Sequence, residues 1–424
     1  MFLCSWSILC LNVPGPKETR LKVMLRKLGL TVVGFLGPEF IFLSALGQWY
    51  SARCSIADFH ASGYTQWTMS HAFFADMGGF VLRTGDDCSF PVDAKQVHYL
   101  VIKDHIEFPE LDKRIIADKN KVDGLLRIIA ICQTLWFVVN VSGRAYQHLA
   151  ITCGELTTAA FIVCSVATTF CWYHKPTDLE TSEVIKTDKS IAEILEEAGV
   201  QGRQLHSRTP LDFVSRKEWT TSRYWWNAKH FARRLHIRIG VTEPPVNRLE
   251  NTTLLALPGS YMWIVSSLTA AYFAIFISGW NYNFPTPQEQ TLWRAASLTM
   301  MVILVVYKCI EDFVCYIYPA IRLRFVSTAT RAPDTKIHRR SRHWPGHGRF
   351  TQKTHAVADY IRNNSEPHDP ALYIPLKALL PQYFLAYIYL HARLYIFIED
   401  VIELRSLPAS AYQTINWTSF FPHF

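Results

Sequence analysis

The sequence is poor in charge and has no pattern of paired cysteines. Only 18% of its 424 residues are charged, against about 25% in an average soluble domain. The ten cysteines include no CxxC pair, and most of them lie inside apolar stretches, where cysteine behaves as a small hydrophobic residue. These absences exclude a disulfide framework and a zinc site of the usual spacing.

The sequence also lacks the motifs of common nucleotide-binding and hydrolytic enzymes. It contains no GxxxxGK[ST] loop, no GxSxG elbow, no Asp-rich diphosphate motif and no internal repeat. His343 and His347 form one HxxxH pattern, as membrane-bound di-iron enzymes do, but no HxxHH follows. Pro345 and Gly346 between the two histidines would break a helix. We therefore expect no metal and no cofactor.

Long apolar runs are abundant. A helix needs roughly 20 mostly apolar residues to cross the hydrocarbon core of a bilayer. Stretches of this length lie at 127–147, 151–173, 259–280, 292–318 and 379–402. The sequence therefore predicts an all-α, multi-pass α-helical membrane protein with about five or six spans and helical cytoplasmic loops.

The apolar stretch 28–50 is interrupted near its middle by Pro38 and Glu39. Proline removes a backbone donor, and an ionised glutamate in hydrocarbon is costly unless it is paired or solvated. If 28–50 does not cross, all the long polar loops and the basic N-terminal stretch share one side, which the positive-inside rule makes cytoplasmic. We predict a broken or re-entrant helix, with a straight span as the alternative.

The spans divide the chain into parts of alternating character. We expect a basic N-terminal segment (1–27), a broken or re-entrant apolar helix (28–50), a polar helical loop (51–126), a transmembrane hairpin (127–173), a cytoplasmic loop with amphipathic helices (174–258), a second transmembrane hairpin (259–318), a basic cytoplasmic loop (319–378), and the last span with the C-terminal tail (379–424).

In the loop 174–258, KSIAEILEEAGV (189–200) has Ser190 as an N-cap and Gly199 as a stop signal. RYWWNAKHFARRLHIRIG (223–240) is basic and aromatic, which is typical of a helix on a membrane surface.

Positive charge is concentrated in two places. Ten Lys and Arg residues lie between Arg322 and Arg362, and five lie between Lys17 and Lys27. Next to apolar spans, such blocks favour an anionic membrane face over nucleic acid. The expected partners are therefore the lipid bilayer and anionic lipid headgroups at the basic loops, and not nucleic acid. The sequence identifies no protein partner.

The stretch SHAFFADMGGF (70–80) carries a histidine, an aspartate and two glycines among phenylalanines. On a helix, His71 and Asp76 would point about 140° apart, so they are not a helical metal pair. One interpretation is a packed helix that ends at Gly78–Gly79 and holds one satisfied histidine. The other is an acid/base pair that a turn brings together. Glu155 also has two interpretations, because a carboxylate in an apolar segment is a functional-site hypothesis, but one near a span's end can reach headgroup water.

Several stretches, in order along the chain, together resemble one family. They are WTMSHAFFADMGGF (67–80), IADKNKVDGL (116–125), CQTLWFVV (132–139), GELTT (154–158), WYHKPTDLE (172–180), FPTPQEQTLWRAAS (284–297), RLYIFIEDVIELRSLP (393–408) and NWTSFFPHF (416–424). The chain resembles a large group of fungal multi-pass integral membrane proteins whose biochemical function is uncharacterised. The resemblance implies a fungal source and a location in the endoplasmic reticulum or plasma membrane. It also implies a shortened N-terminal segment here, and it carries no catalytic residue across.

Our first expectation for function is a non-catalytic scaffold or sensor-like membrane component, because no known catalytic motif is present. The alternative is a membrane-embedded enzyme acting on an isoprenoid or lipid, with His71 and Asp76 as acid and base. Its candidate catalytic residues are His71, Asp76, Glu155, His174 and Asp178. A third possibility is a transporter whose path is lined by Glu39, Glu155 and Lys308. An enzyme requires its candidates to converge on a pocket, whereas a scaffold leaves each hydrogen-bonded separately.

Overall fold

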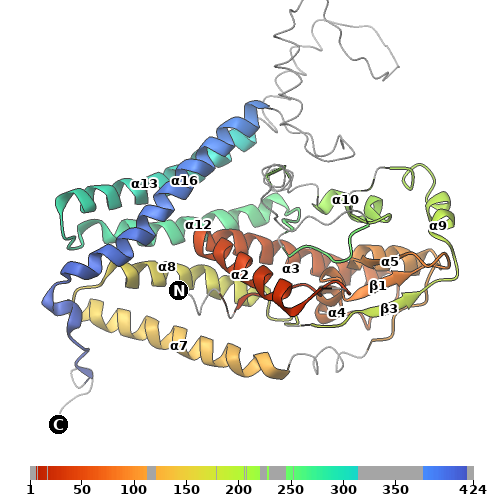
Figure 1. Cartoon of the computed structure of the whole chain (residues 1–424), viewed down its shortest axis with the longest axis horizontal. Coiled ribbons are helices and arrows are strands. Elements are labelled where there is room, and N and C mark those ends of the chain that lie inside the picture. The colour runs from red at the N-terminus through yellow and green to blue at the C-terminus, as the bar shows by residue number, and fades with distance from the viewer. Residues whose placement is uncertain are drawn as a thin grey trace, which may run out of the picture. The chain divides into compact units, whose positions relative to one another are not determined.

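The fold is drawn in Figure 1 from a computed structural model of the whole chain. The structure describes residues 6, 8–16, 18–111, 121–177, 179–204, 206, 208–219, 227–228, 245–251, 253–313 and 376–417. The chain divides into two units, of which the first comprises residues 1–222, 242–298 and 392–424, and the second comprises 223–241 and 299–391. Everything described below, except the far ends of two helices, belongs to the first unit.

Helices make up most of the described chain, as the sequence predicts. In chain order they are α2 Arg20–Leu36, α3 Pro38–Ala61, α4 Met69–Asp76, α5 Ala94–Ile102, α7 Lys121–Tyr146, α8 Cys153–Cys171, α9 Ile191–Glu197, α10 Asp212–Trp219, α12 Gly259–Ser278, α13 Pro287–Asp312 and α16 Leu376–Ile402, with short 3-10 turns η2 Gly279–Asn281, η5 Glu403–Ser406 and η6 Ala409–Tyr412. Helix α13 begins in the first unit, and α16 ends in it.

Four of the described helices are long and apolar enough to cross a membrane. They are α7, α8, α12 and α13, with mean hydropathy between 1.4 and 1.6 over their apolar stretches. Helix α8 packs against both α3 and α12 and is the most buried of the four, whereas the apolar stretch of α7 is not buried at all. A long helix with an apolar, uncovered surface is typical of a segment that faces lipid.

Helix α16 covers the last predicted span but is not one of these four helices. It is continuous from Leu376 to Ile402 with Pro381 inside it, and it carries Arg393, Glu399 and Asp400. It therefore does not join the four described helices that are apolar enough to cross on composition alone.

The segment that contains the predicted break is bent sharply. Helices α2 and α3 meet at Gly37 with an angle of 112° between them. Pro38 is the first residue of α3, where its missing N–H has no intrahelical partner to lose. The pair is thus a broken span or a re-entrant loop, because a straight crossing cannot contain this bend.

A small sheet, which the all-α prediction and the predicted helical loop 51–126 both omit, joins two distant parts of the chain. Strand β1 (Phe80–Arg83) pairs antiparallel with β2 (Ser89–Val92) and parallel with β3 (Glu183–Lys186), giving the order β2-β1-β3. Phe80 and Leu82 of the central strand are fully buried. Strands of four residues are too short for an alternating pattern to distinguish them from loop.

The sheet is the centre of a compact part of the first unit that we call the head: the second half of α3, α4, the sheet, α5, α9 and α10. Its core is aromatic, with Phe59 stacked on Trp67 at 4.1 Å between ring centroids. Gly78 has φ +78°, and a Cβ on Gly79 would lie 2.5 Å from the Phe74 ring. The two glycines of SHAFFADMGGF therefore allow a left-handed turn and a close approach to an aromatic ring.

The predicted helix at 189–200 is present as α9. It follows Ser190, whose hydroxyl accepts from the Glu193 N–H, and it ends before Gly199, which has φ +63°. The basic aromatic stretch 223–240 and the basic loop 319–378 lie almost entirely outside the described residues.

Candidate functional site

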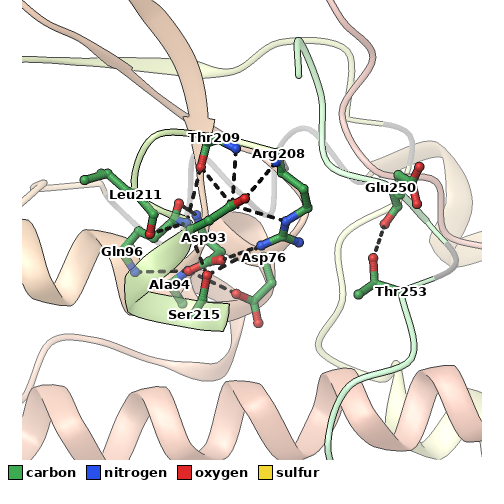
Figure 2. Close-up of polar contacts among 11 residues, drawn as sticks. Asp76, Asp93, Ala94, Gln96, Arg208, Thr209, Leu211, Ser215, Glu250 and Thr253 are labelled. Atoms are coloured by element: carbon green, nitrogen blue, oxygen red, sulfur yellow. Dashed lines mark hydrogen bonds and ion pairs between the residues drawn. The ribbon is translucent and has the colours of Figure 1, made fainter. Parts of the chain in front are cut away.

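The candidate site is a buried group of polar side chains in the head, and Asp76 at the end of α4 is its centre. Asp76 Oδ1 accepts a hydrogen bond of 3.0 Å from the Ala94 N–H, the first amide of α5 (Figure 2). Desolvation of its carboxylate, reinforced by the neighbouring Asp93 carboxylate, raises the pKa of Asp76 to about 7. A carboxyl group with this pKa changes charge in the physiological range.

Asp93 is the N-cap of α5 and the second buried carboxylate of the group. Its side chain accepts a hydrogen bond of 3.0 Å from the Gln96 N–H, and the Gln96 Oε1 accepts one from the Asp93 N–H. The two bonds make a capping box. Arg208 lies 3.5 Å from its carboxylate. Burial raises the pKa of Asp93, and the positive charge of Arg208 opposes that rise.

The segment that leads into α10 completes the group. The Gln96 side-chain amide donates to Thr209, Leu211 and Ser215, so it ties α5 to this segment (Figure 2). Asp212 accepts from the backbone N–H groups of Arg208 and Thr209. These bonds link segments more than 110 residues apart in sequence. We call the group the clasp; it comprises Asp76, Asp93, Gln96, Arg208, Thr209, Asp212 and Ser215.

A small cavity lies beside this clasp. Its volume is about 50 Å³, which is room for one or two water molecules. It is lined by Asn12, Gln48, Ser51, Asp76, Asp93, Lys95, Arg208, Ser215, Leu249, Glu250, Thr253 and Leu255. Most of the lining residues have polar or charged side chains, with both signs of charge, so the cavity can hold water or a small polar group.

His71, the other half of the predicted acid/base pair, is engaged elsewhere. Its Nδ1 accepts from the Thr68 N–H at 3.2 Å, and its Nε2 lies 2.7 Å from the Leu111 carbonyl oxygen. Because Nδ1 is an acceptor here, Nε2 carries the proton and donates it to that carbonyl. The ring also stacks on Trp67. Both nitrogens therefore serve the capping and packing of α4.

The structure does not bring Glu155 to the head. Glu155 lies in the first turn of α8, accepts from the Thr152 N–H and pairs with Arg144 at 3.1 Å. His174 follows the other end of α8. The rise of about 1.5 Å per residue puts about 24 Å between Glu155 and that end. Glu155 and His174 therefore lie at opposite ends of α8 and do not converge on one pocket.

The remaining predicted residues do not form a site with these. His174 is exposed, with its ring against Tyr173, and Asp178 lies outside the described residues. Lys308, proposed for a transport path, belongs to the second unit. In the parts of the chain that the structure describes, no three His, Cys, Asp or Glu residues lie close enough together to hold a metal ion.

Sequence reasoning missed the buried cation beside His174. Lys175 is 1% exposed, donates to Gln48 at 2.8 Å and lies over the Trp172 ring. Its only signal in the sequence was its place in the WYHKPTD stretch. Arg208 and Asp93 were missed as well, because nothing in their local sequence distinguishes them from surface charges.

A second buried charge lies among the apolar helices. Arg393 of α16 is fully buried, and its guanidinium faces four aromatic rings at 4.6 to 5.5 Å from their centroids. The rings belong to Phe161, Tyr272, Phe276 and Phe397. Within the described residues, none of its three nitrogens has a hydrogen-bond partner. Aromatic faces stabilise such a cation through their quadrupoles.

Comparison with known proteins gives one match. The model of a family described as a family of unknown function (DUF8562) matches residues 1–197 and 375–424, which is more than half of the chain. It covers Asp76, Asp93 and Arg393 and leaves out the segment with Arg208. No curated protein and no solved structure matches the chain.

Proposed function

We propose that this chain, which belongs to that family of unknown function, is an integral membrane protein that acts as a non-catalytic scaffold or sensor-like component. One observation carries the proposal: the residues predicted to act as acid and base are bound separately. His71 uses both ring nitrogens in packing α4, and Glu155 is paired with Arg144. Among the predicted catalytic residues that the structure describes, Asp76 lines the cavity beside the clasp, which is too small for an isoprenoid or a lipid.

The connections within the head support the membrane placement. Strands β1 and β3 pair, although α7 and α8 lie between them in sequence, so the α7–α8 hairpin returns to the side from which it started. The α2–α3 pair also begins and ends at the head, because the Val13 N–H donates to the Met77 carbonyl. This supports a re-entrant pair, since the segment enters and leaves on one side.

The rest of the proposal follows the charge distribution. The head and the basic stretches face the cytoplasm, with the basic loops against anionic lipid headgroups. The membrane is that of the endoplasmic reticulum or the plasma membrane. Asp76 supports the sensor interpretation, because its pKa of about 7 lets a small change of pH alter the charge at the clasp.

The second candidate function is a membrane-embedded enzyme acting on an isoprenoid or lipid. The observation that favours it is the pair of buried carboxylates, Asp76 and Asp93, beside a cavity, with one pKa near neutrality. Paired carboxyl groups with separated pKa values are a common acid/base arrangement. A transporter, whose path was expected to be lined by Glu39, Glu155 and Lys308, ranks third.

Lipid analysis with matched variants distinguishes the first two candidates. Lipid extracts are compared from cells that lack the protein and from cells that express the wild type, Asp76→Asn or the control Asp58→Asn. Asp58 is an exposed carboxylate on α3. A non-catalytic protein predicts that both variants, present at wild-type levels, give the wild-type lipid profile. A precursor lipid that accumulates both without the protein and with Asp76→Asn would establish the enzyme instead.

A further inference from the structure

A second cavity, larger than the one beside the clasp, lies away from the head, where the connections between the apolar helices meet. Its volume is about 320 Å³. We call it the hairpin-end cavity; it is lined by Ala145, His148, Leu149, Ala150, Ile151, Thr152, Asn281, Tyr282, Asn283, Glu403, Leu407, Pro408 and Ala411. Figure 1 shows the α7–α8 and α12–α13 connections and the end of α16 at the same end of the helices.

The cavity contains one fixed carboxylate. Glu403 is 2% exposed, and its Oε2 accepts from the Cys153 N–H at 2.7 Å, which holds the group in place. No lysine or arginine is among the lining residues. A buried carboxylate needs a compensating cation or several donors, and the lining supplies few.

Arg144, which precedes the lining residue Ala145, is already neutralised. Arg144 pairs with Glu155 at 3.1 Å, and its other terminal nitrogen donates to the carbonyl groups of Ala150 and Ala411. It therefore braces the wall of the cavity, and its charge is balanced by Glu155. The Glu403 carboxylate lines the cavity; burial raises its pKa, and the hydrogen bonds from Cys153 oppose that rise.

The other polar groups suit a cation with N–H donors. Asn281, Tyr282 and Asn283 also line the cavity, so two amide side chains and one aromatic side chain border it. The Asn281 Oδ1 also accepts a hydrogen bond of 3.4 Å from Arg294. Burial and then the neighbouring acidic groups, which include Glu155 and Glu403, raise the pKa of the Tyr282 hydroxyl. Carboxylate, amide oxygen and aromatic face are the groups that recognise an ammonium ion.

We propose that the hairpin-end cavity binds the ammonium group of a small amine, either a free amine or the amine headgroup of a phospholipid. The volume accommodates a headgroup-sized molecule and excludes a whole lipid. The cavity lies at the ends of helices that are apolar enough to cross a membrane, which is the level of lipid headgroups. This proposal goes beyond the scaffold or sensor function and does not depend on it.

The test uses the full chain in detergent and in nanodiscs, with three variants. Glu403→Gln removes the charge but keeps an acceptor for the Cys153 N–H. Ala145→Leu fills the cavity from an exposed position on α7 and leaves the charge. Glu289→Gln is the control, because Glu289 pairs with Arg405 and does not line the cavity.

Two probes separate the sources of the ammonium group. Calorimetry measures binding of ethanolamine, and native mass spectrometry measures retention of phosphatidylethanolamine against phosphatidylglycerol. We expect Glu403→Gln and Ala145→Leu each to weaken binding at least tenfold, which is about 1.4 kcal/mol, while Glu289→Gln binds like the wild type. Binding of ethanolamine identifies a free amine, and selective retention of phosphatidylethanolamine alone identifies a headgroup.

Two results would overturn the proposal. One is that the wild type binds neither probe. The other is that Ala145→Leu, whose exposed position spares the fold, binds as tightly as the wild type. If Glu403→Gln fails to fold, Ala145→Leu still decides the outcome. Because binding is measured directly on the purified protein, neither result bears on whether the head is catalytic.

Discussion

The head and the apolar helices bury charge in opposite ways. In the head, Asp76 and Asp93 are held by backbone N–H groups and by the Arg208 side chain. Among the apolar helices, Arg393 is surrounded by aromatic rings and has no hydrogen-bond partner in the described residues. Hydrogen-bond donors and an ion pair stabilise the carboxylates in the head, whereas the electron-rich faces of aromatic rings stabilise Arg393.

The difference shows what each part of the chain can supply. Helix N-termini and loops in the head offer unpaired N–H groups, which stabilise carboxylates. In the middle of long helices, every backbone group is already bonded, so only side chains can face a buried charge. Aromatic rings then take the place of hydrogen-bond acceptors around Arg393. The four predictions that follow test this contrast, from the largest expected effect to the smallest.

Replacing Arg393 by alanine is expected to have the largest effect. It leaves a void among four rings and removes the cation near Asp400, so we expect the free energy of unfolding to fall by about 5 kcal/mol. Thermal unfolding of the purified protein in detergent measures the change. Arg393→Met keeps most of the volume and should lose much less. If the methionine variant loses as much as alanine, the charge itself holds these helices together.

Asp76→Asn is expected to change how stability depends on pH. The pKa of Asp76 is about 7 in the fold and 3.8 in the unfolded chain, so the folded protein binds this proton more tightly. Its contribution to stability is full below pH 4 and is lost as the pH rises to 7, by on the order of 4 kcal/mol. The variant should therefore match the wild type near pH 4 and exceed it above pH 7.

The measurement for Asp76→Asn is denaturant unfolding across that pH range. Asp58→Asn, at an exposed position of α3, should keep the wild-type profile. An Asp76→Asn variant whose stability falls with pH as steeply as the wild type would show that another group in the head is responsible.

Arg208→Ala tests whether the clasp works as a unit. It leaves Asp93 buried beside Asp76 without its cation, and we expect a loss of about 2 kcal/mol. A double-mutant cycle with Asp93→Asn measures the coupling. The double variant should lose clearly less than the sum of the two single variants, because asparagine no longer needs the arginine. Additive losses would mean that the two side chains act independently.

Ser190→Ala provides a reference away from both buried charges. It removes the cap of the short helix α9, so we expect a loss of about 1 kcal/mol at most. Hydrogen exchange should be faster at the amides of α9, beginning with Glu193, and unchanged in α5. Faster exchange throughout the head would show that α9 is part of the same cooperative unit as the clasp.

The apolar helices and α9 could be predicted from the sequence, because both rest on local signals. A run of apolar residues defines a span-like helix by length, and a cap with a terminal glycine defines the ends of α9. The sharp turn at Pro38 was likewise expected from one proline and one glutamate. Helix α16 shows the limit of such local signals. Its length fits a span, but its charged residues make their contacts with partners elsewhere in the chain.

The clasp could not be predicted, because it depends on contacts between distant segments. Arg208 and Asp93 meet only after the chain has folded, and each is unremarkable in its own stretch of sequence. The small sheet was missed because its strands are only four residues long and because β3 pairs with a strand far away in the sequence. His71 and Asp76 were considered as a possible acid/base pair from their spacing, but their neighbours, rather than their spacing, decide what each contacts.

The pairing of β1 with β3 has a consequence for synthesis of the protein. Phe80 lies opposite Glu183, so 103 residues, including both α7 and α8, must leave the ribosome before the sheet can close. Until then β1 has its β2 partner but an open edge on the other side. The head therefore cannot be completed before the α7–α8 hairpin has been made. The three-stranded sheet can form only if that hairpin brings β3 back to β1.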